Sequence, residues 1–346
     1  MVVYPDAGRF SAGPLNIIFK MVRQHRIEVL HCHMFRSQVF GYLVARILGR
    51  TAVKLIFHEH GTAVAMDSGS RLSNVAFRLF QTAAAPRVDL HIAVSRFVEE
   101  SLVELTHGRI QESIVLYNPA RRLAHASELT SSYRARVRED LGVPANAFVV
   151  GMATRIIRRK GWRDVLAAIS LLAERYPIFF LIAGDGPEFL EMTSEISARN
   201  LDRRGRALCY LENLTGLYAA LDCFVMASHW EPAGLSHLEA QYLSVPVVAC
   251  NVPGLNETVQ ANVNCMMCRP NDPEDMAEKI AFLIAEPVVR RCIAEAGRMN
   301  AERFSIERYT YELNALYSEL ARGKDRGSRG LSSTQGDADS DQRMAG

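Results

Sequence analysis

Two glutamates on either side of a glycine suggest sugar chemistry in the second half of the chain. Glu231 and Glu239 flank the residues Gly234, Leu235 and Ser236, and an apolar run follows them. An ionised carboxylate is an acceptor-only group that suits the hydroxyls of a ligand, and vicinal hydroxyls indicate a sugar. The backbone N–H groups between the glutamates would lie at a helix start, where anions bind. Either glutamate could instead be an ordinary helix carboxylate, one that complements the dipole or faces solvent.

Two cations, Arg155 and Lys160, lie in a loop upstream of these glutamates. The loop follows an apolar run and precedes a helical pattern, and a helix start after a strand is where phosphate groups bind. The two cations could together hold a diphosphate, although a solvated basic loop has the same composition. Gly184 and Gly186 lie in a further turn that would let a ligand approach the backbone, or that is simply a tight turn.

These loops need a scaffold, and the second half supplies one through the alternation of short apolar runs with helical patterns. The runs cover residues 148–154, 178–184, 207–211, 223–228, 246–250 and 264–268. Runs of this length and composition are typical of parallel strands covered on both faces. The alternation predicts a doubly wound α/β sheet, which binds ligands at the carboxyl ends of its strands.

The first half shows the same alternation less completely. Strands are predicted within residues 27–33, 53–60 and 88–95, and helices within 15–26 and 38–49. A chain of 346 residues is long enough for two domains. We therefore expect an incomplete first Rossmann-like domain and a complete second one, separated by a polar stretch at about residues 120–135. The expected bounds are 1–122 for the first domain and 136–303 for the second, with a disordered tail at 323–346.

The composition excludes several classes of protein. The formal charge is +2 and the charged residues are interspersed, so no nucleic-acid partner is expected. No apolar run approaches the length of about 20 residues that a membrane-spanning helix needs, and the start of the chain does not resemble a signal peptide. Seven scattered cysteines fit a reducing compartment. We expect a cytoplasmic protein, with peripheral contact at the inner face of the membrane left open.

Four segments, taken in order, resemble the C-terminal half of the group 1 retaining glycosyltransferases of the GT-B fold. They are TRIIRRKGW, LIAGDGPE, SHWEPAGLSHLEAQYLSVPVVA and VPGLNETV. Upstream, the segments EVLHCHMF, FHEHG, IAVSRFVEESL and VLYNPA resemble the N-terminal domain of that family. The segment at 305–321 resembles its final helix, which returns to the first domain. The resemblance extends from about Ile27 to Leu320.

The resemblance implies roles for the residues that match. Arg155 and Lys160 would hold the diphosphate of a nucleotide-sugar donor and stabilise it as it leaves. Glu231 would contact the hydroxyls of the donor sugar, and Glu239 would lie near the ribose. The donor would also contact backbone at the glycine-containing turns, namely Gly234, Leu235, Ser236, Gly184 and Gly186.

His60 matches the histidine of the family's catalytic domain, and His33 is a weaker candidate for the rim of the cleft. On sequence alone, a strand-end histidine such as His60 is more often held by a structural hydrogen bond. Cys265 and Cys268 form a C-x-x-C without a second pair, which favours two buried thiols over a zinc site. Neither an Asp-x-Asp motif nor a histidine cluster argues for a metal, so no metal and no cofactor are expected.

The implied activity is transfer of a sugar from a nucleoside-diphosphate sugar to a hydroxyl of a glycan or glycolipid acceptor, with retention of anomeric configuration. Synthesis of cell-surface polysaccharide, lipopolysaccharide or glycolipid would be its setting. Two alternatives remain open: a degraded protein that binds the nucleotide sugar without an acceptor site, and an epimerase of the same fold. The first arises because nothing before Ile27 resembles the family's first strand and Gly-rich loop. An incomplete first sheet would favour pairing with another chain, so a homo-oligomer is also open.

Overall fold

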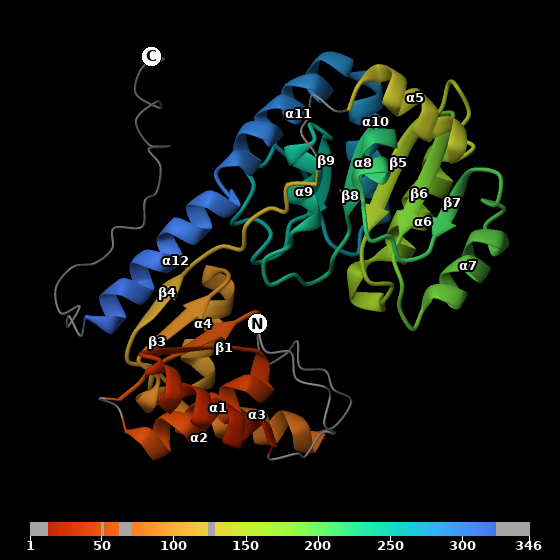
Figure 1. Cartoon of the computed structure of the whole chain (residues 1–346). Coiled ribbons are helices and arrows are strands. Elements are labelled where there is room, and N and C mark those ends of the chain that lie inside the picture. The colour runs from red at the N-terminus through yellow and green to blue at the C-terminus, as the bar shows by residue number, and fades with distance from the viewer. Residues whose placement is uncertain (1–12, 50–51, 62–70, 124–128, 323–346) are drawn as a thin grey trace, which may run out of the picture.

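Two separate parallel sheets organise the protein. The computed structural model describes residues 13–49, 52–61, 71–123 and 129–322, with the first sheet near the N-terminus and the second in the later part of the chain (Figure 1). The expected tail at 323–346 and the residues before Gly13 lie outside the described residues. The α/β class with two parallel sheets, predicted from the alternating pattern, is confirmed.

The first sheet has four strands in the order β1-β2-β3-β4, all parallel. The strands are β1 (Val29–His33), β2 (Lys54–Glu59), β3 (Leu90–Ala93) and β4 (Ser113–Val115). The helices in this part of the chain are α1 (Gly13–His25), α2 (Met34–Leu48), α3 (Arg71–Ala84), the 3₁₀ turn η2 (Ala85–Arg87) and α4 (Arg96–Leu105).

Successive residues of β2 face opposite sides of this sheet, as the strand geometry requires. Leu55 and Phe57 pack with residues of α2 and α3, whereas Ile56 packs with Leu316 of α12 (Ile306–Ala321). The last helix of the chain therefore covers one face of the first sheet, and Figure 1 shows it running back from α11 toward β3 and β4.

The second sheet has six parallel strands in the order β10-β9-β8-β5-β6-β7. The strands are β5 (Phe148–Ala153), β6 (Ile178–Ala183), β7 (Gly205–Leu208), β8 (Cys223–Met226), β9 (Val247–Cys250) and β10 (Met266–Cys268). Its helical segments are α5 (Ser131–Asp140), η4 (Arg158–Lys160), α6 (Trp162–Ala173), α7 (Phe189–Ala198), α8 (Thr215–Ala220), α9 (Ser236–Tyr242), α10 (Pro273–Ala285) and α11 (Pro287–Glu302). The strand order reverses between β5 and β8, and such a switch point is where ligands bind in open α/β sheets.

The core of the second sheet is large because its central strands are buried on both faces. All six residues of β5 and of β6 are buried, which explains why their sequences are continuous apolar runs. Trp162, Tyr218 and Phe224 are among the fully buried side chains that fill this core. The strands flanking the switch point are therefore held rigidly, and the loops that leave them start from fixed positions.

A carboxylate connects the second half of the chain to the first sheet's helices. Glu257 lies in the loop after β9, and its two oxygens accept hydrogen bonds from the backbone N–H groups of Arg96, at 2.7 Å, and Phe97, at 2.9 Å. The hydroxyl of Tyr117 donates to the same carboxylate at 3.0 Å. Glu257 thus satisfies the first free N–H groups of α4, a position that a negative charge stabilises.

Several boundaries differ from those expected from the sequence, and those of α5 and β7 are examples. Helix α5 begins at Ser131, inside the polar stretch treated there as a linker, because Thr130 caps it by accepting from the N–H of Tyr133. This helix is polar, yet it is fixed by ion pairs from Arg134 and Arg138 to Asp222, at 2.7 and 2.6 Å. Strand β7 ends earlier than the apolar run at 207–211 indicated.

The loop between β5 and α6 requires a glycine at its last position, which gives a test of its packing. Gly161 has a φ of +70°, and a Cβ there would lie 2.0 Å from the carbonyl oxygen of Ala227. Gly142 has nearly the same φ of +67°, but a Cβ there would meet only the flexible end of Arg206, at 3.2 Å. We predict that Gly161→Ala lowers the free energy of unfolding by about 2–5 kcal/mol, from backbone strain and the clash together.

The matched variant Gly142→Ala should lose only the strain of a left-handed alanine, about 1–2 kcal/mol. Urea unfolding followed by circular dichroism measures both changes. Equal losses for the two variants would contradict the close contact between the β5 and β8 loops.

Candidate functional site

The loops that leave β5 and β8 bring a lysine and a glutamate together at the switch point. Lys160 Nζ donates a short hydrogen bond to Oε2 of Glu231, and the hydroxyl of Ser228 donates to the same oxygen at 3.1 Å. The side chains of Lys160 and Glu231 are only 18% and 6% exposed. A buried carboxylate needs such partners, because burial without them costs several kcal/mol.

A small hollow of about 60 Å³ opens beside this ion pair. Lys160, Ser228 and Glu231 line it, together with Thr154 at the end of β5 and the turn 234–236 at the start of α9. The hollow therefore combines a cation, a carboxylate and backbone from a helix start, which can bind a phosphate and a hydroxyl side by side.

Glycines let the surrounding loops approach one another at this site. Gly234 has a φ of +67°, which places the turn of residues 234–236 against Met226 of β8. Gly254 has a φ of +82°, and a Cβ there would lie 2.3 Å from the carbonyl oxygen of Glu231. A larger residue at Gly254 would push the loops of β8 and β9 apart.

Glu239 lies on the first turn of α9, away from the hollow's lining residues but on the helix that borders it. Burial raises its pKa above the usual value, while the hydroxyl of Tyr218, 3.1 Å from Oε2, and the guanidinium of Arg121 oppose that rise. Arg121 Nε lies 3.6 Å from Oε1. The carboxylate is therefore anchored by one buried hydroxyl and faces one largely exposed cation.

Arg155 and the two glycines of the β6 loop do not line this hollow. Arg155 is exposed and is not among the residues that line the hollow. A Cβ on Gly184 would lie 1.8 Å from the carbonyl oxygen of Thr154, and one on Gly186 would lie 2.3 Å from that of Ile156. These glycines have a packing requirement of their own, because the β6 loop presses on the β5 loop.

Glu188 holds the Lys160 loop in place, a function that the sequence analysis did not assign. Its carboxylate accepts from the backbone N–H of Arg158 at 2.9 Å, from the indole of Trp162 at 2.9 Å and from Arg163 at 3.0 Å. Burial alone would raise its pKa, but these hydrogen bonds outweigh it and lower the pKa below the usual range. The sequence offered a signal for this role of Glu188, because the residue follows directly on the turn that contains Gly184 and Gly186.

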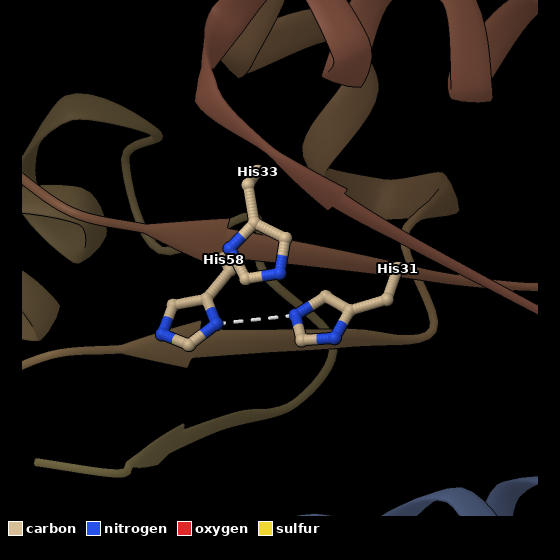
Figure 2. Close-up of side chains that lie close together, drawn as sticks. All are labelled: His31, His33 and His58. Carbon is tan, nitrogen blue, oxygen red and sulfur yellow. Dashed lines mark hydrogen bonds between the residues drawn. The ribbon is translucent and has the colours of Figure 1, made fainter. Parts of the chain in front are cut away.

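Histidines of the first sheet lie together at the carboxyl ends of β1 and β2, so the expectation that no histidine cluster exists is wrong. His31, His33 and His58 each offer one ring nitrogen within 4.8 Å of the others, as Figure 2 shows. His60 joins them, because its Nε2 lies 2.8 Å from Nδ1 of His33. The sequence signal was two H-x-H pairs on neighbouring strands, since residues i and i+2 of a strand share a face.

The histidines of this cluster are neutral at neutral pH. Burial, with the rings of His33 and His60, lowers the pKa of His31 to about 4, and burial with the other three rings lowers that of His58 to about 2. Burial also lowers the pKa of His33. Burial and His33 lower the pKa of His60, against the opposing charge of Glu59.

None of the helices in the described ranges is long and apolar enough to cross a membrane.

Comparison with known families assigns both halves of the chain. Residues 134–300 match the profile described as glycosyl transferases group 1, and residues 2–120 match Glycosyltransferase Family 4. The second match begins at residue 2, so the resemblance extends further toward the N-terminus than the expected start at Ile27.

Curated relatives and solved structures agree with this assignment. The chain is 31% identical over 303 residues to a D-inositol 3-phosphate glycosyltransferase of Arthrobacter sp. strain FB24, covering 82% of this chain and 68% of the relative. It is 26% identical over 324 residues to the enzyme of that name from Corynebacterium urealyticum, covering 88% and 74%.

Among solved structures, Anabaena Alr3699/HepE in complex with UDP-glucose superposes with a TM-score of 0.77 at 22% identity, covering 88% of this chain and 82% of that one. A glycosyltransferase from Rickettsia africae gives 0.80 at 20% identity, covering 93% and 85%. At these identities the structures establish the fold, and the sequence matches establish the family. The chain therefore belongs to the group 1 glycosyltransferases, Glycosyltransferase Family 4, a family of retaining enzymes with the GT-B fold.

Proposed function

We propose that this nucleotide-sugar glycosyltransferase uses a UDP-sugar and places the donor diphosphate at the switch point between β5 and β8. The observation that carries the proposal is the buried pair of Lys160 and Glu231 beside a hollow at the carboxyl ends of these strands. There a cation is available for a phosphate and a carboxylate for sugar hydroxyls, which are the two groups that adjoin the bond to be broken.

The reaction breaks the bond between the anomeric carbon and the diphosphate, and negative charge grows on the departing oxygen. In the proposal, Lys160 Nζ and the backbone N–H groups of residues 234–236 donate to the departing diphosphate. Such fixed donors stabilise the growing charge with little reorganisation. Glu231 accepts from a hydroxyl of the donor sugar and Glu239 binds the ribose. Arg155, from its exposed position on the β5 loop, turns toward the diphosphate when the donor binds.

The acceptor approaches from the side of the first sheet, where His60 is the proposed polar contact. We place the acceptor among the glycans and glycolipids of the cell surface, by analogy with the family. Relatives act on small hydroxylated compounds according to their names, which include N-acetyl-alpha-D-glucosaminyl L-malate synthase of Bacillus anthracis.

The choice of uridine rests on Anabaena HepE, whose structures contain UDP and UDP-glucose. A thermal-shift panel of UDP-, GDP- and ADP-sugars tests it, followed by transfer or hydrolysis assays with each donor that binds. A rise in melting temperature with UDP-sugars alone supports the proposal. A rise with GDP- or ADP-sugars alone would show that the donor carries that nucleotide and not UDP. Binding without turnover would favour the degraded enzyme.

We predict that Glu231→Gln lowers the rate of sugar transfer at saturating donor by roughly ten- to a hundredfold. The substitution keeps the shape of the side chain but removes one charge-assisted contact, worth about 1.5–3 kcal/mol. Initial-rate kinetics measure the effect, and circular dichroism checks the fold. Glu278→Gln, at an exposed position on α10, is the matched control and should retain the wild-type rate. An unchanged turnover in the Glu231 variant would exclude this carboxylate from the reaction.

Lys160→Ala should weaken UDP binding by roughly tenfold or more, because it removes the one cation lining the hollow in the described chain. Isothermal titration with UDP gives the dissociation constant directly. Arg291→Ala removes an exposed charge from α11 and should leave UDP affinity unchanged. If the Lys160 variant folds and binds UDP as tightly as the wild type, the diphosphate site lies elsewhere.

A further inference from the structure

The histidine cluster is built by the register of two parallel strands. His33 of β1 pairs with His58 of β2, and His31 lies two residues before His33 on the same strand face. This is the face that α12 covers, since Ile56 packs against Leu316 and the hydroxyl of Tyr317 lies 2.6 Å from Nδ1 of His31. Three imidazoles from two strands therefore meet under the last helix.

The ring nitrogens are close enough to share one cation. Nε2 of His31 lies 3.1 Å from Nδ1 of His58, and the third ring nitrogen, from His33, lies within 4.8 Å of both. Two imidazole nitrogens bound to one zinc ion at about 2.0–2.1 Å in tetrahedral geometry would lie about 3.3 Å apart. In Figure 2, one ring nitrogen of His33 points toward the hydrogen bond that joins His31 and His58.

We propose that His31, His33 and His58 form a binding site for a divalent transition metal of the zinc class. Three imidazole ligands and no thiolate or carboxylate favour Zn²⁺, Co²⁺, Ni²⁺ or Cu²⁺ over Mg²⁺ and Ca²⁺, which require oxygen ligands. His33 is exposed and gives the ion a path from solvent, so water completes the coordination.

The other nitrogens of two ligands already have hydrogen-bond partners. Nδ1 of His31 is hydrogen-bonded to the hydroxyl of Tyr317, and Nδ1 of His33 is hydrogen-bonded to Nε2 of His60. Such outer contacts fix the tautomer and the ring orientation of a ligand. The ion would take the place of the hydrogen shared by His31 and His58, which would move to the other nitrogen of its own ring, so that each ligand stays a neutral imidazole.

This site is separate from the proposed donor site, because none of the three histidines lines the hollow beside Lys160, and it adjoins His60, the proposed acceptor contact. The site would join β1, β2 and α12 through a single ion.

The test is a Co²⁺ titration of the full-length chain, purified without a polyhistidine tag and stripped with a chelator. Visible absorption bands should grow to saturation at one equivalent of Co²⁺ and disappear when Zn²⁺ displaces it. His31→Gln and His33→Gln should each weaken binding at least tenfold, and Tyr317→Phe should weaken it by roughly 10–100-fold through its outer contact. Circular dichroism checks that each variant is folded.

The matched control is His25→Gln at the exposed end of α1, which should bind Co²⁺ like the wild type. Absence of saturable binding in the wild type would overturn the proposal. Wild-type affinity in a folded His33 variant, whose side chain is exposed and tolerant of substitution, would also overturn it. A site that is lost in His25→Gln instead would place the metal on α1.

Discussion

A buried ion pair at a point where the strand order reverses is the constraint on which the rest of the second half depends. Lys160 and Glu231 come from the loops after β5 and β8, and neither charge is stable at this depth without the other. The two loops must therefore meet, which requires the left-handed Gly161 against Ala227 and the carboxylate of Glu188 behind the lysine loop. Packing, backbone conformation and charge all serve one contact.

The same ion pair determines which kind of ligand the site favours. In the structure the cation of Lys160 is neutralised by Glu231, so in the proposed donor complex the diphosphate would exchange one anionic partner of the lysine for another. The released carboxylate is then without its cation and gains by accepting from hydroxyls. An anion linked to a sugar supplies both requirements, whereas phosphate alone supplies one.

The fold could be predicted from the sequence because the patterns that indicate its strands and helices lie within short segments. The apolar runs of β5 and β6 and the helical spacing of α6 indicate doubly covered strands without any knowledge of neighbours. The switch-point residues could be located for the same reason, since Lys160 and Glu231 each follow a recognisable strand.

Features that depend on register or long-range contact were not predictable. The histidine cluster needs β1 and β2 aligned so that His33 lies beside His58, and nothing in either segment fixes that alignment. Helix α5 was missed because its polar sequence is stabilised by Asp222, more than eighty positions away. Arg155 matches a motif and is exposed, and its contact with a donor stays a prediction.

The carboxylate of Glu257 at the start of α4 has a consequence for how the molecule can move. Any hinge motion that separates the loop after β9 from the first sheet must break three hydrogen bonds at once and return a carboxylate, two amides and a phenol to water. Glu257 therefore opposes any motion that would draw the loop after β9 away from α4 and Tyr117.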